Sequence, residues 1–376
     1  MRKLVVIPSD PIEAYELKGT SSWLKEYYNP NNFFDEVYVL SPIETIEREV
    51  YGLKIIPITS NKHYKQQLNQ IKPICVRTYG GYWATDYGNY NKVKGIPVIS
   101  SVHDTNPDLI HKSLKFSDYI IVMSDVIKKT LLKENLAYSK DIYTLGNRVD
   151  PGNFKSLDVS DLRLKEIKET IPYDKFILLI GRKTDQKNID NVLKAMNSIP
   201  EGYGLVLAGQ GNMDQYDKTI IDYNLVDRVL NIETIQNSDL PYYYNLASLL
   251  CNPSKWEGFG VVFIEAAFCK CKIVSSNIAP MNEFILNDGI MNYLVDDFES
   301  SKAIAKGINE LLGCPEINDD TYNFIFDKFS KKVVASNEVD CYNNTQSRGR
   351  HFSLSYLLWK TRIAISKSKR AKIFIK

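Results

Sequence analysis

The sequence lacks any run of about eighteen apolar residues, the length that a helix needs to cross a bilayer, so no membrane span is expected. It also lacks a recognisable targeting segment. The basic pair Arg2 and Lys3 is followed by an apolar run over residues 4–7 only, which is far too short for the core of a signal peptide and suits a first β-strand. We therefore expect a cytosolic protein.

Cysteine is scarce. The six cysteines are scattered and several lie inside apolar runs, a pattern typical of reduced, buried thiols. Cys269 and Cys271 form a C-x-C pair, but no second cysteine or histidine pair lies at ligand spacing, so packing is favoured over a metal site. The composition, 44% apolar and 24% charged, is that of a globular protein, and 376 residues suffice for two domains.

Charge is unevenly distributed. The net charge is +2, but the segment 343–376 carries nine Lys or Arg residues and no acid, which leaves the first 342 residues with 38 basic and 45 acidic side chains. The tail mixes these cations with aromatic and aliphatic residues, which suits an anionic membrane surface. A helix that packs back onto the first domain explains the same pattern equally well. Nucleic-acid binding explains it less well, because no recognition motif accompanies the charge.

Short β-branched runs alternate with helical stretches. Strands are expected near residues 3–7, 36–40, 54–58, 73–77, 97–101, 118–123, 142–145, 176–181, 204–208, 229–233, 248–252, 272–275 and 292–295. Helices are expected near residues 125–137, 187–198, 239–247, 260–269 and 299–312. Buried strands spaced by helices favour parallel sheets covered on both faces, and two series of about six favour two Rossmann-like domains.

This α/β chain is predicted to divide into a first domain at 1–150, a charged linker with two prolines at 151–174, a second domain at 175–342 and the basic tail. Two doubly wound domains facing each other would form a cleft at the carboxyl ends of their strands, where ligands bind in such folds. Functional residues are therefore expected in the loops that follow strands.

The segment Asn252–Ala267 runs from a buried strand through a glycine turn into a helix. Gly258 and Gly260 allow close approach of the backbone to a ligand, and the first N–H groups of the helix can hold an anion. Glu257 and Glu265 are spaced to contact two parts of one elongated ligand. The alternative is an ordinary acidic helix start followed by a solvent-facing glutamate.

The segment Leu179–Asn188 repeats the strand–turn–helix pattern. Arg182 and Lys187 bracket its loop, where they could neutralise a diphosphate, or could simply be solvated loop cations. In the first domain His103 ends an apolar strand, which makes it a candidate for hydrogen bonding to substrate. A structural histidine that caps a neighbouring backbone group is the alternative.

These segments together resemble one family. Glu257 to Glu265 matches the E-x7-E pattern of retaining glycosyltransferases with the GT-B fold, and its surroundings resemble glycosyltransferase family 4, the glycosyl transferases group 1 domain. Further segments resemble that family in the same order, namely His103-Asp104, Ser117–Ser124, Asn147–Asp150, Gly181-Arg182 with Lys187, Leu207–Gly211 and Phe329-Ser330. The resemblance covers roughly residues 95–342.

The resemblance implies a retaining, metal-independent hexosyltransferase that uses a UDP- or GDP-linked sugar as substrate and needs no cofactor. Arg182 and Lys187 would hold the donor diphosphate and stabilise the charge that develops as the nucleotide leaves. Glu265 would hydrogen-bond the ribose hydroxyls, and His103 would contact the transferred sugar. The acceptor would be a glycan or lipid-linked glycan, made for a bacterial surface polysaccharide by an enzyme in the cytoplasm or on the inner face of the membrane.

The remaining implied contacts involve one carboxylate and several backbone groups. Glu257 would contact sugar hydroxyls and act in catalysis with His103 and the two cations. The backbone of Gly258, Phe259 and Gly260 would approach the sugar and phosphates, and Gly19 would lie close to the phosphates. The family often has Gly-Gly where this chain has Gly19 followed by threonine.

Other functions on the same fold stay open at this point. A nucleotide-sugar epimerase or a phosphorylase would use the same donor site. A non-catalytic GT-B module that recruits a partner enzyme is suggested by the region 269–283, where Cys269–Ile273 lacks the family's usual glycine and proline. Because all the ligand-contacting charged residues are present, an active transferase is favoured.

Overall fold

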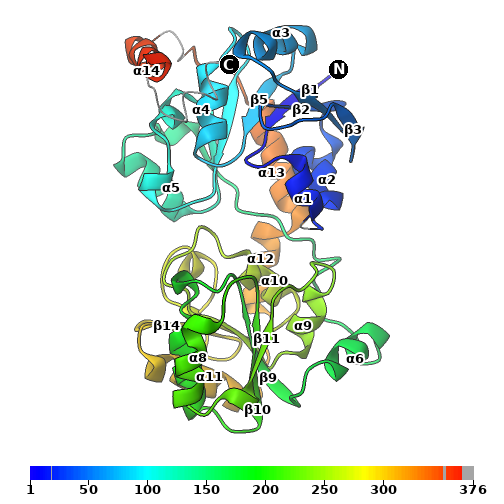
Figure 1. The fold of residues 1–376 in the computed structure, drawn as a ribbon, viewed down its shortest axis with the longest axis vertical. Helices are drawn as coiled ribbons and strands as arrows, with labels where there is room; N and C mark the ends of the chain where they lie inside the picture. Colours follow the sequence, from blue (N-terminus) through cyan, green and yellow to red (C-terminus); the bar gives the residue numbers. More distant parts are fainter. Residues whose placement is uncertain (18, 350–352, 366–376) are drawn as a thin grey trace. The chain divides into compact units, whose positions relative to one another are not determined.

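The computed structural model describes residues 1–17, 19–349 and 353–365. The chain forms two compact units, and each is described here by itself (Figure 1). Unit 1 contains Met1–Gly146 and returns at Val334, whereas unit 2 contains Asn147–Val333. The chain therefore passes from one unit to the other twice.

Unit 1 is built on an eight-stranded sheet with the order β3-β4-β2-β1-β5-β6-β7-β8. The strands are β1 (Lys3–Ile7), β2 (Glu36–Ser41), β3 (Arg48–Val50), β4 (Leu53–Pro57), β5 (Cys75–Thr78), β6 (Val98–Val102), β7 (Tyr119–Val122) and β8 (Ile142–Thr144). All neighbours pair in parallel except β3 and β4. Only the short edge strand β3 was not expected, because its charged three-residue sequence gives no apolar run.

Helices cover both faces of this sheet. They are α1 (Ile12–Leu17), α2 (Leu24–Tyr28), α3 (Asn61–Ile71), α4 (Trp83–Tyr90), α5 (Asp125–Lys133), α13 (Lys331–Asn343) and α14 (Leu354–Ile365). On one face Tyr64 of α3 and Tyr87 of α4 pack against Val5 and Val76 of the strands. On the other face Glu338 of α13 reaches β5. The continuous apolar strands are thus buried from both sides, as parallel sheets require.

Unit 2 is built on a six-stranded parallel sheet with the order β11-β10-β9-β12-β13-β14. Its elements are α6 (Leu162–Glu169), β9 (Lys175–Ile180), α7 (Ile189–Ala195), β10 (Tyr203–Ala208), α8 (Asp214–Asp222), β11 (Val229–Ile232), α9 (Leu240–Leu246), β12 (Leu249–Asn252), α10 (Val261–Phe268), β13 (Ile273–Ser276), β14 (Asn292–Val295), α11 (Ser301–Gly313) and α12 (Asp320–Phe329). Helices α7, α8 and α11 contribute to one core against this sheet. Each strand and helix expected from the sequence is present.

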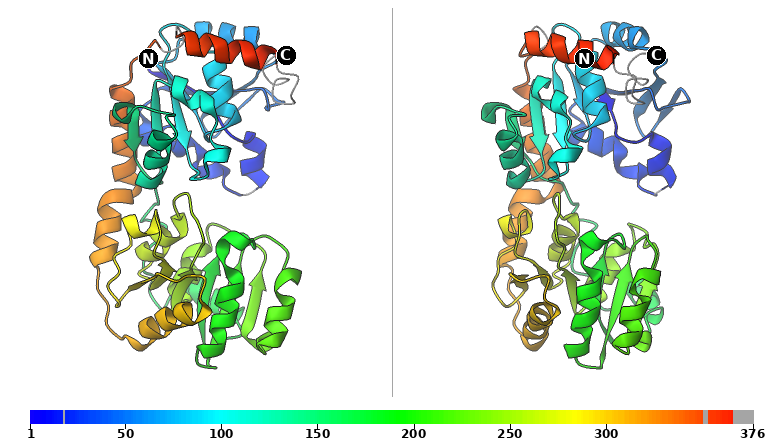
Figure 2. Two further views of the ribbon diagram at one scale, coloured as in Figure 1. Left: turned by 90° about the vertical axis from the view of Figure 1, so that its left-hand side faces the viewer. Right: turned by 60° about the vertical axis from the view of Figure 1, so that its left-hand side comes forward.

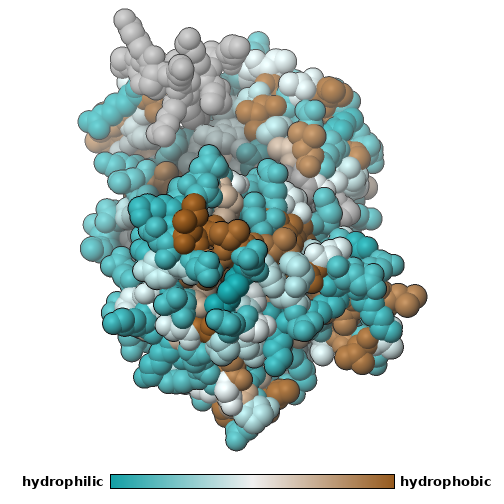
Figure 3. All heavy atoms as spheres, turned by 60° about the horizontal axis from the view of Figure 1, so that its bottom comes forward, coloured by the Kyte–Doolittle hydropathy of each residue, from teal (hydrophilic) through white to brown (hydrophobic). Residues whose placement is uncertain are grey.

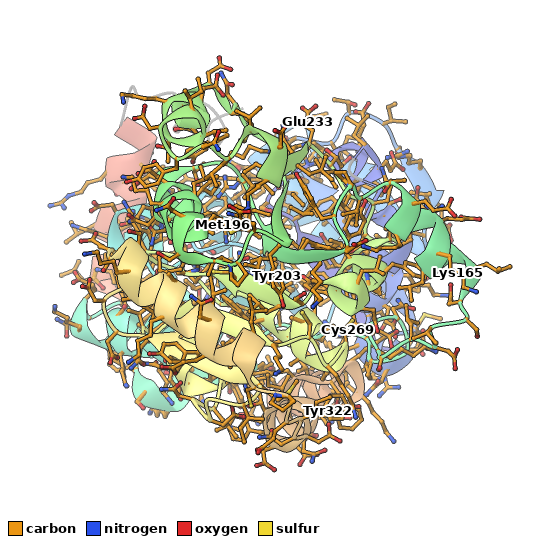
Figure 4. All side chains as sticks on the ribbon, turned by 90° about the horizontal axis from the view of Figure 1, so that it is seen from below. Lys165, Met196, Tyr203, Glu233, Cys269 and Tyr322 are labelled. Carbon is orange, nitrogen blue, oxygen red and sulfur yellow. The ribbon has the colours of Figure 1, made fainter. Side chains whose placement is uncertain are left out.

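Arg228 fastens the amino-terminal edge of the unit 2 sheet. Its guanidinium donates to the backbone carbonyls of Met196 at 3.2 Å and Tyr203 at 3.0 Å, and these two residues lie near each other in Figure 4. Elsewhere in this unit Cys269, labelled in the same figure, is buried directly after α10. All six cysteines are free and five of them are buried, so the expected reduced, mostly buried thiols are present. Burial raises the pKa of the Cys271 thiol to about 12.

The units differ from the predicted domain boundaries in two places. Residues 151–174 belong to unit 2, because Phe154 and the α6 residues Leu164 and Ile167 are buried and Asn245 of α9 bonds the backbone of this segment. In addition, most of α13 belongs to unit 1. Charge and proline content suggested a linker, but the buried pair at i and i+3 is enough to dock a helix.

The described part of the basic tail packs on unit 1. The N–H of Arg348 donates to Asp118 at 2.7 Å, and its guanidinium lies 4.8 Å from the Tyr119 ring. In α14 the hydroxyl of buried Tyr356 donates to the Asn89 carbonyl at 2.8 Å. Both views of Figure 2 show α14 lying across unit 1 beside α3 and α4. This arrangement corresponds to one of the two hypotheses for the tail, a helix that packs back onto the first domain.

None of the described helices combines the length and apolar character needed to cross a bilayer. The face drawn in Figure 3 is mostly hydrophilic, with apolar residues in small separate groups.

Candidate functional site

The strand order of unit 2 reverses between β9 and β12, which is the switch point of its sheet. Here the side chain of Asn252 accepts from the N–H of Ile180 at 3.0 Å and donates to its carbonyl at 2.5 Å. The amide side chain thus satisfies the last backbone groups of β9 where the regular ladder to β12 has already ended. In doubly wound sheets, ligands bind at such a point, in the loops after the two strands.

The loops after β9 and β12 are tied together at this switch point. The ammonium of Lys187 pairs with the carboxylate of Glu257. Beside this pair, the amide of Gln186 donates to the Trp256 carbonyl at 2.8 Å, and the N–H of Lys255 donates to the Gln186 carbonyl at 2.9 Å. Two loops separated by 70 residues in sequence therefore form one surface.

The two predicted loop cations differ in their surroundings. Lys187 is largely buried and paired, and its side chain crosses Gly181 so closely that a Cβ there would lie 2.5 Å from the Lys187 Cε. Arg182 is exposed and makes no side-chain hydrogen bond or ion pair with the residues that the structure describes. Arg182 is thus the group whose positive charge is available to an anionic ligand.

Lys183, which the sequence reasoning did not single out, supports this loop from behind. Its ammonium donates to the carbonyl of Gly209, and its N–H donates to the Gln210 carbonyl at 2.8 Å. The loops after β9 and β10 approach so closely that a Cβ on Gly209 would lie 2.1 Å from the Gly181 oxygen. Gly209 has φ 140°, so glycine is required there by contact and by conformation. Lys183 could not have been found from sequence, since it lies among other charged loop residues.

The glycine turn before α10 has the predicted form. Gly260 has φ 82° in the left-handed region and precedes the helix, and no side chain in the described chain caps this helix start. Its first N–H groups are therefore open to an anion. The Phe259 ring is buried against Phe284 and Phe329, so only its backbone can meet a ligand. Gly258 lies beside it in the same turn.

Glu265 lies in the second turn of α10 and is only 7% exposed. The hydroxyl of Tyr244 on α9 donates to its carboxylate at 2.8 Å. Burial raises the pKa of Glu265 to about 7, and the Tyr244 hydrogen bond offsets part of this rise. A carboxyl group with one fixed donor and a nearly neutral pKa is suited to accept further hydrogen bonds from sugar hydroxyls. Tyr244 was not predicted, because nothing in the helix sequence marks it.

Unit 1 has its own switch point, between β1 and β5. Gly19 lies in the segment after β1, directly beyond α1, with φ 66° and its N–H bonded to the Glu16 carbonyl at 3.0 Å, as expected for a glycine that ends a helix. After β5 come Gly80, with φ 80°, and Gly81, whose added Cβ would lie 3.3 Å from Val102. This second glycine pair was not singled out from the sequence.

His103 directly follows β6, as expected. The residue is half-buried, its Nε2 is enclosed without a hydrogen-bond partner in the described chain, and the Tyr79 ring lies 6.4 Å away. Burial and, to a smaller extent, the positive charge of Arg77 lower the pKa of His103 to about 4. At neutral pH the ring is therefore uncharged, with one enclosed nitrogen that lacks a partner.

The structure thus gathers most of the predicted residues at one place in unit 2. Arg182, Lys187 and Glu257 lie in the two joined loops, and the turn with Gly258, Phe259 and Gly260 leads into the helix of Glu265. His103 and Gly19 lie in unit 1, each after a strand of that sheet.

Residues 163–325, which include this group, match the family model described as glycosyl transferases group 1. Residues 163–325 are therefore a group 1 glycosyltransferase domain, and the chain is a glycosyltransferase. An uncharacterized glycosyltransferase of Methanocaldococcus jannaschii is 24% identical over 69% of this chain and 73% of its own length. The O-antigen chain mannosyltransferase RfbU of Salmonella typhimurium is 22% identical over 73% of this chain and 82% of its own.

Solved structures share the fold of this glycosyltransferase. HepE of Anabaena in complex with UDP superposes with a TM-score of 0.73 at 14% identity, covering 92% of this chain and all of its own. A glycosyltransferase of Rickettsia africae superposes with a TM-score of 0.71 at 18% identity, covering 91% of this chain and 97% of its own. The predicted GT-B fold and the predicted transferase class are confirmed.

Proposed function

We propose that this glycosyltransferase moves a hexose from a UDP- or GDP-linked donor to a glycan or lipid-linked glycan, with retention of anomeric configuration and without a metal, in bacterial surface polysaccharide synthesis. The observation that carries the donor assignment is the switch point of unit 2. There a cation and a helix start, both without a side-chain partner among the described residues, lie together with a buried ion pair. Among the relatives, an O-antigen mannosyltransferase and a capsular polysaccharide glycosyltransferase of Staphylococcus aureus act in such syntheses.

In this proposal, Arg182 and the N–H groups at the start of α10 bind the donor diphosphate, and Lys187 adds its charge while paired to Glu257. Both groups stabilise the charge that develops on the leaving nucleotide, which replaces the role of a metal. Glu265 accepts hydrogen bonds from the ribose, and Tyr244 holds its carboxylate in place.

The transferred sugar meets Glu257 and the backbone of Gly258, Phe259 and Gly260 in this proposal. His103 contacts the sugar as a neutral hydrogen-bonding group, and Gly19 lies close to the phosphates. His103, Arg182, Lys187 and Glu257 are the catalytic set.

The enzyme is proposed to work in the cytoplasm, on the inner face of the membrane, where a lipid-linked acceptor is available. The supporting feature is α14, whose outward face exposes Leu354, Leu357 and Leu358 between 52% and 73%. Arg362 is exposed on the same helix. Leucines beside a cation suit the boundary of an anionic bilayer.

The stereochemistry can be tested without knowing the acceptor. A panel of UDP- and GDP-hexoses is incubated with the enzyme, and the sugar released by slow donor hydrolysis is followed by proton NMR before it mutarotates. We expect one donor to be consumed and its sugar to appear with the donor's own anomeric configuration. Release of the opposite anomer contradicts retention, and no consumption of any donor contradicts the donor class.

A further inference from the structure

Arg77, on β5 of unit 1, is a buried cation that the donor site does not use. It is 2% exposed, and its Nη2 lies 3.6 Å from the carboxylate of Glu338 on α13. Its Nε and Nη1 atoms have no hydrogen-bond partner in the described chain. Such an arrangement is costly, because a buried charge needs both a counter-ion and hydrogen bonds.

The neighbours include the proposed sugar-contacting histidine. β5 and β6 pair in parallel with Arg77 opposite Ile99, so Ser101, two residues on, lies on the same face of the sheet as Arg77, and His103 follows directly after the strand. The Ser101 hydroxyl and the His103 Nε2 are both enclosed without partners in the described chain. Tyr79 lies between Arg77 and His103, with its ring 5.0 Å from the Arg77 guanidinium and 6.4 Å from the His103 ring.

Two opposite charges act on His103 within this cluster. Arg77 lowers the pKa of the imidazole and Glu338 raises it, while burial alone accounts for the largest part of the lowering. Tyr79 and Tyr342 also face the cluster, and burial raises the pKa of Tyr342 well above its usual value, so that side chain is neutral at ordinary pH.

The remaining titratable groups of the cluster are two thiols and the carboxylate next in the chain. Burial raises the pKa of Cys75 and takes that of Cys341 to about 12, so both are neutral thiols. Asp104 follows His103 and is half-buried. The charges that meet the imidazole through the sheet face are therefore those of Arg77 and Glu338.

We propose that Arg77 is a positioning residue for sugar transfer: against the opposing charge of its counter-ion Glu338, it favours a neutral imidazole at His103 that can hydrogen-bond the transferred sugar. Positive charge develops on a sugar ring as its glycosidic bond breaks, so an imidazolium at this position would oppose the reaction while a neutral ring does not. Glu338 is itself fixed by a 2.7 Å hydrogen bond from Tyr342. The inference rests on the proposed contact between His103 and the sugar.

The test is the pKa of His103, read by NMR of histidine-labelled full-length protein and assigned by the signal lost in His103→Gln. Arg77→Met is expected to raise this pKa by about one unit or more, Arg77→Lys to leave it close to wild type, and Glu338→Gln to lower it. If the substitutions acted by loosening the fold, the pKa of His103 would rise toward its ordinary value in both Arg77→Met and Glu338→Gln. Shifts of opposite sign in the two variants therefore show an effect of charge. Arg48→Met removes the partly exposed ion pair between Arg48 and Glu16 in the same unit and serves as the matched control.

Because Arg77→Met removes a buried positive charge beside Glu338, the double variant Arg77→Met/Glu338→Gln provides a second measurement. It is expected to raise the pKa of His103 by less than the single Arg77 change. In variants with the raised pKa, kcat should fall about tenfold per pH unit below that pKa, with nucleotide binding unchanged. An unshifted His103 pKa, or a shifted pKa with an unaltered pH profile of kcat, overturns the inference. Loss of nucleotide binding by the wild-type protein would instead overturn the proposed function.

Discussion

Lys187 and Glu257 form an ion pair that joins the two loops at the switch point of the unit 2 sheet. Both side chains are close to nine-tenths buried, so neither charge is well hydrated. The pair neutralises one of the two loop cations, and the other, Arg182, has no counter-ion in the part of the chain that the structure describes. Removing the Glu257 carboxylate therefore makes the site more positive, whereas removing the Lys187 ammonium makes it more negative.

Glu257→Gln is expected to tighten UDP or GDP binding about three- to tenfold, because it leaves Lys187 uncompensated, and Lys187→Met is expected to weaken it by a similar factor. Calorimetric titration measures both. Transfer should fall in both variants, since in the proposed function Glu257 contacts the sugar and Lys187 stabilises the leaving nucleotide. Lys218→Met, which breaks an exposed pair with Asp222 on α8, is the control and should not change affinity. Movement of both affinities in one direction would show that the pair acts through loop structure instead of charge.

Glu265 gives a pH-dependent stability. The pKa of Glu265 is about 7 in the folded chain, whereas its ordinary value is 4.5. Between pH 4.5 and pH 7 the Glu265 carboxyl is therefore protonated in the folded protein and ionised in the unfolded protein. Folding stability from this group is therefore full below about pH 4.5 and is lost as pH rises to about 7, by up to about 3 kcal/mol. Urea unfolding at pH 5 and pH 8 should show that loss in the wild type and not in Glu265→Gln. Equal losses in the two proteins would contradict it.

Tyr244→Phe should weaken nucleotide binding at pH 7.5 about tenfold, because it removes the fixed donor to Glu265, raises the pKa of this carboxyl further and leaves it poorly oriented. Comparison of UDP with 2′,3′-dideoxy-UDP isolates the ribose contact. The variant and the wild type should bind the dideoxy nucleotide equally. If the variant loses the same factor for both nucleotides, Glu265 does not serve the ribose.

The outward leucines of α14 should mediate binding to anionic vesicles. Replacing Leu354, Leu357 and Leu358 by serine is expected to reduce co-sedimentation with phosphatidylglycerol vesicles several-fold, since each change removes apolar surface that would be buried at the bilayer boundary. A matched triple change at the exposed residues Leu162, Ile221 and Ile317 of unit 2 should have no effect. Equal co-sedimentation of the two triple variants would rule out α14 as the membrane contact.

The order of strands and helices could be predicted from sequence because each buried strand is a continuous apolar run. Lys3–Ile7 and Lys175–Ile180 are examples, and both pair on two sides within their sheets. The division into units was less predictable. Charge made residues 151–174 resemble a linker, whereas Phe154 packs against Tyr244 of α9 and Asn245 bonds the backbone of this segment. The return of α13 to unit 1 depends on Glu338 and Tyr342, whose partners are more than 250 residues away in sequence.

The candidate site was predictable where charge and glycine spacing carried the signal. Arg182, Glu257 and Glu265 fall at strand ends or helix starts, which the sequence shows directly. It could not show that Lys187 is neutralised by Glu257, that Tyr244 orients Glu265, or that Arg77 lies near His103. Each of these relationships joins side chains on different elements, and single-sequence patterns carry no information about such pairs.

The most direct test is calorimetric titration of UDP, GDP, ADP and CMP into the wild type and into Arg182→Ala and Glu265→Ala. We predict that the wild type binds one of UDP and GDP and binds neither ADP nor CMP. Both substitutions should weaken the affinity for that nucleotide at least tenfold, because each removes a charged hydrogen-bonding group. Arg163→Ala on α6, an exposed arginine paired with Asp239, should bind as the wild type does. If no nucleotide binds, or if Arg182→Ala and Glu265→Ala bind as tightly as the wild type, the switch point of unit 2 is not the donor site.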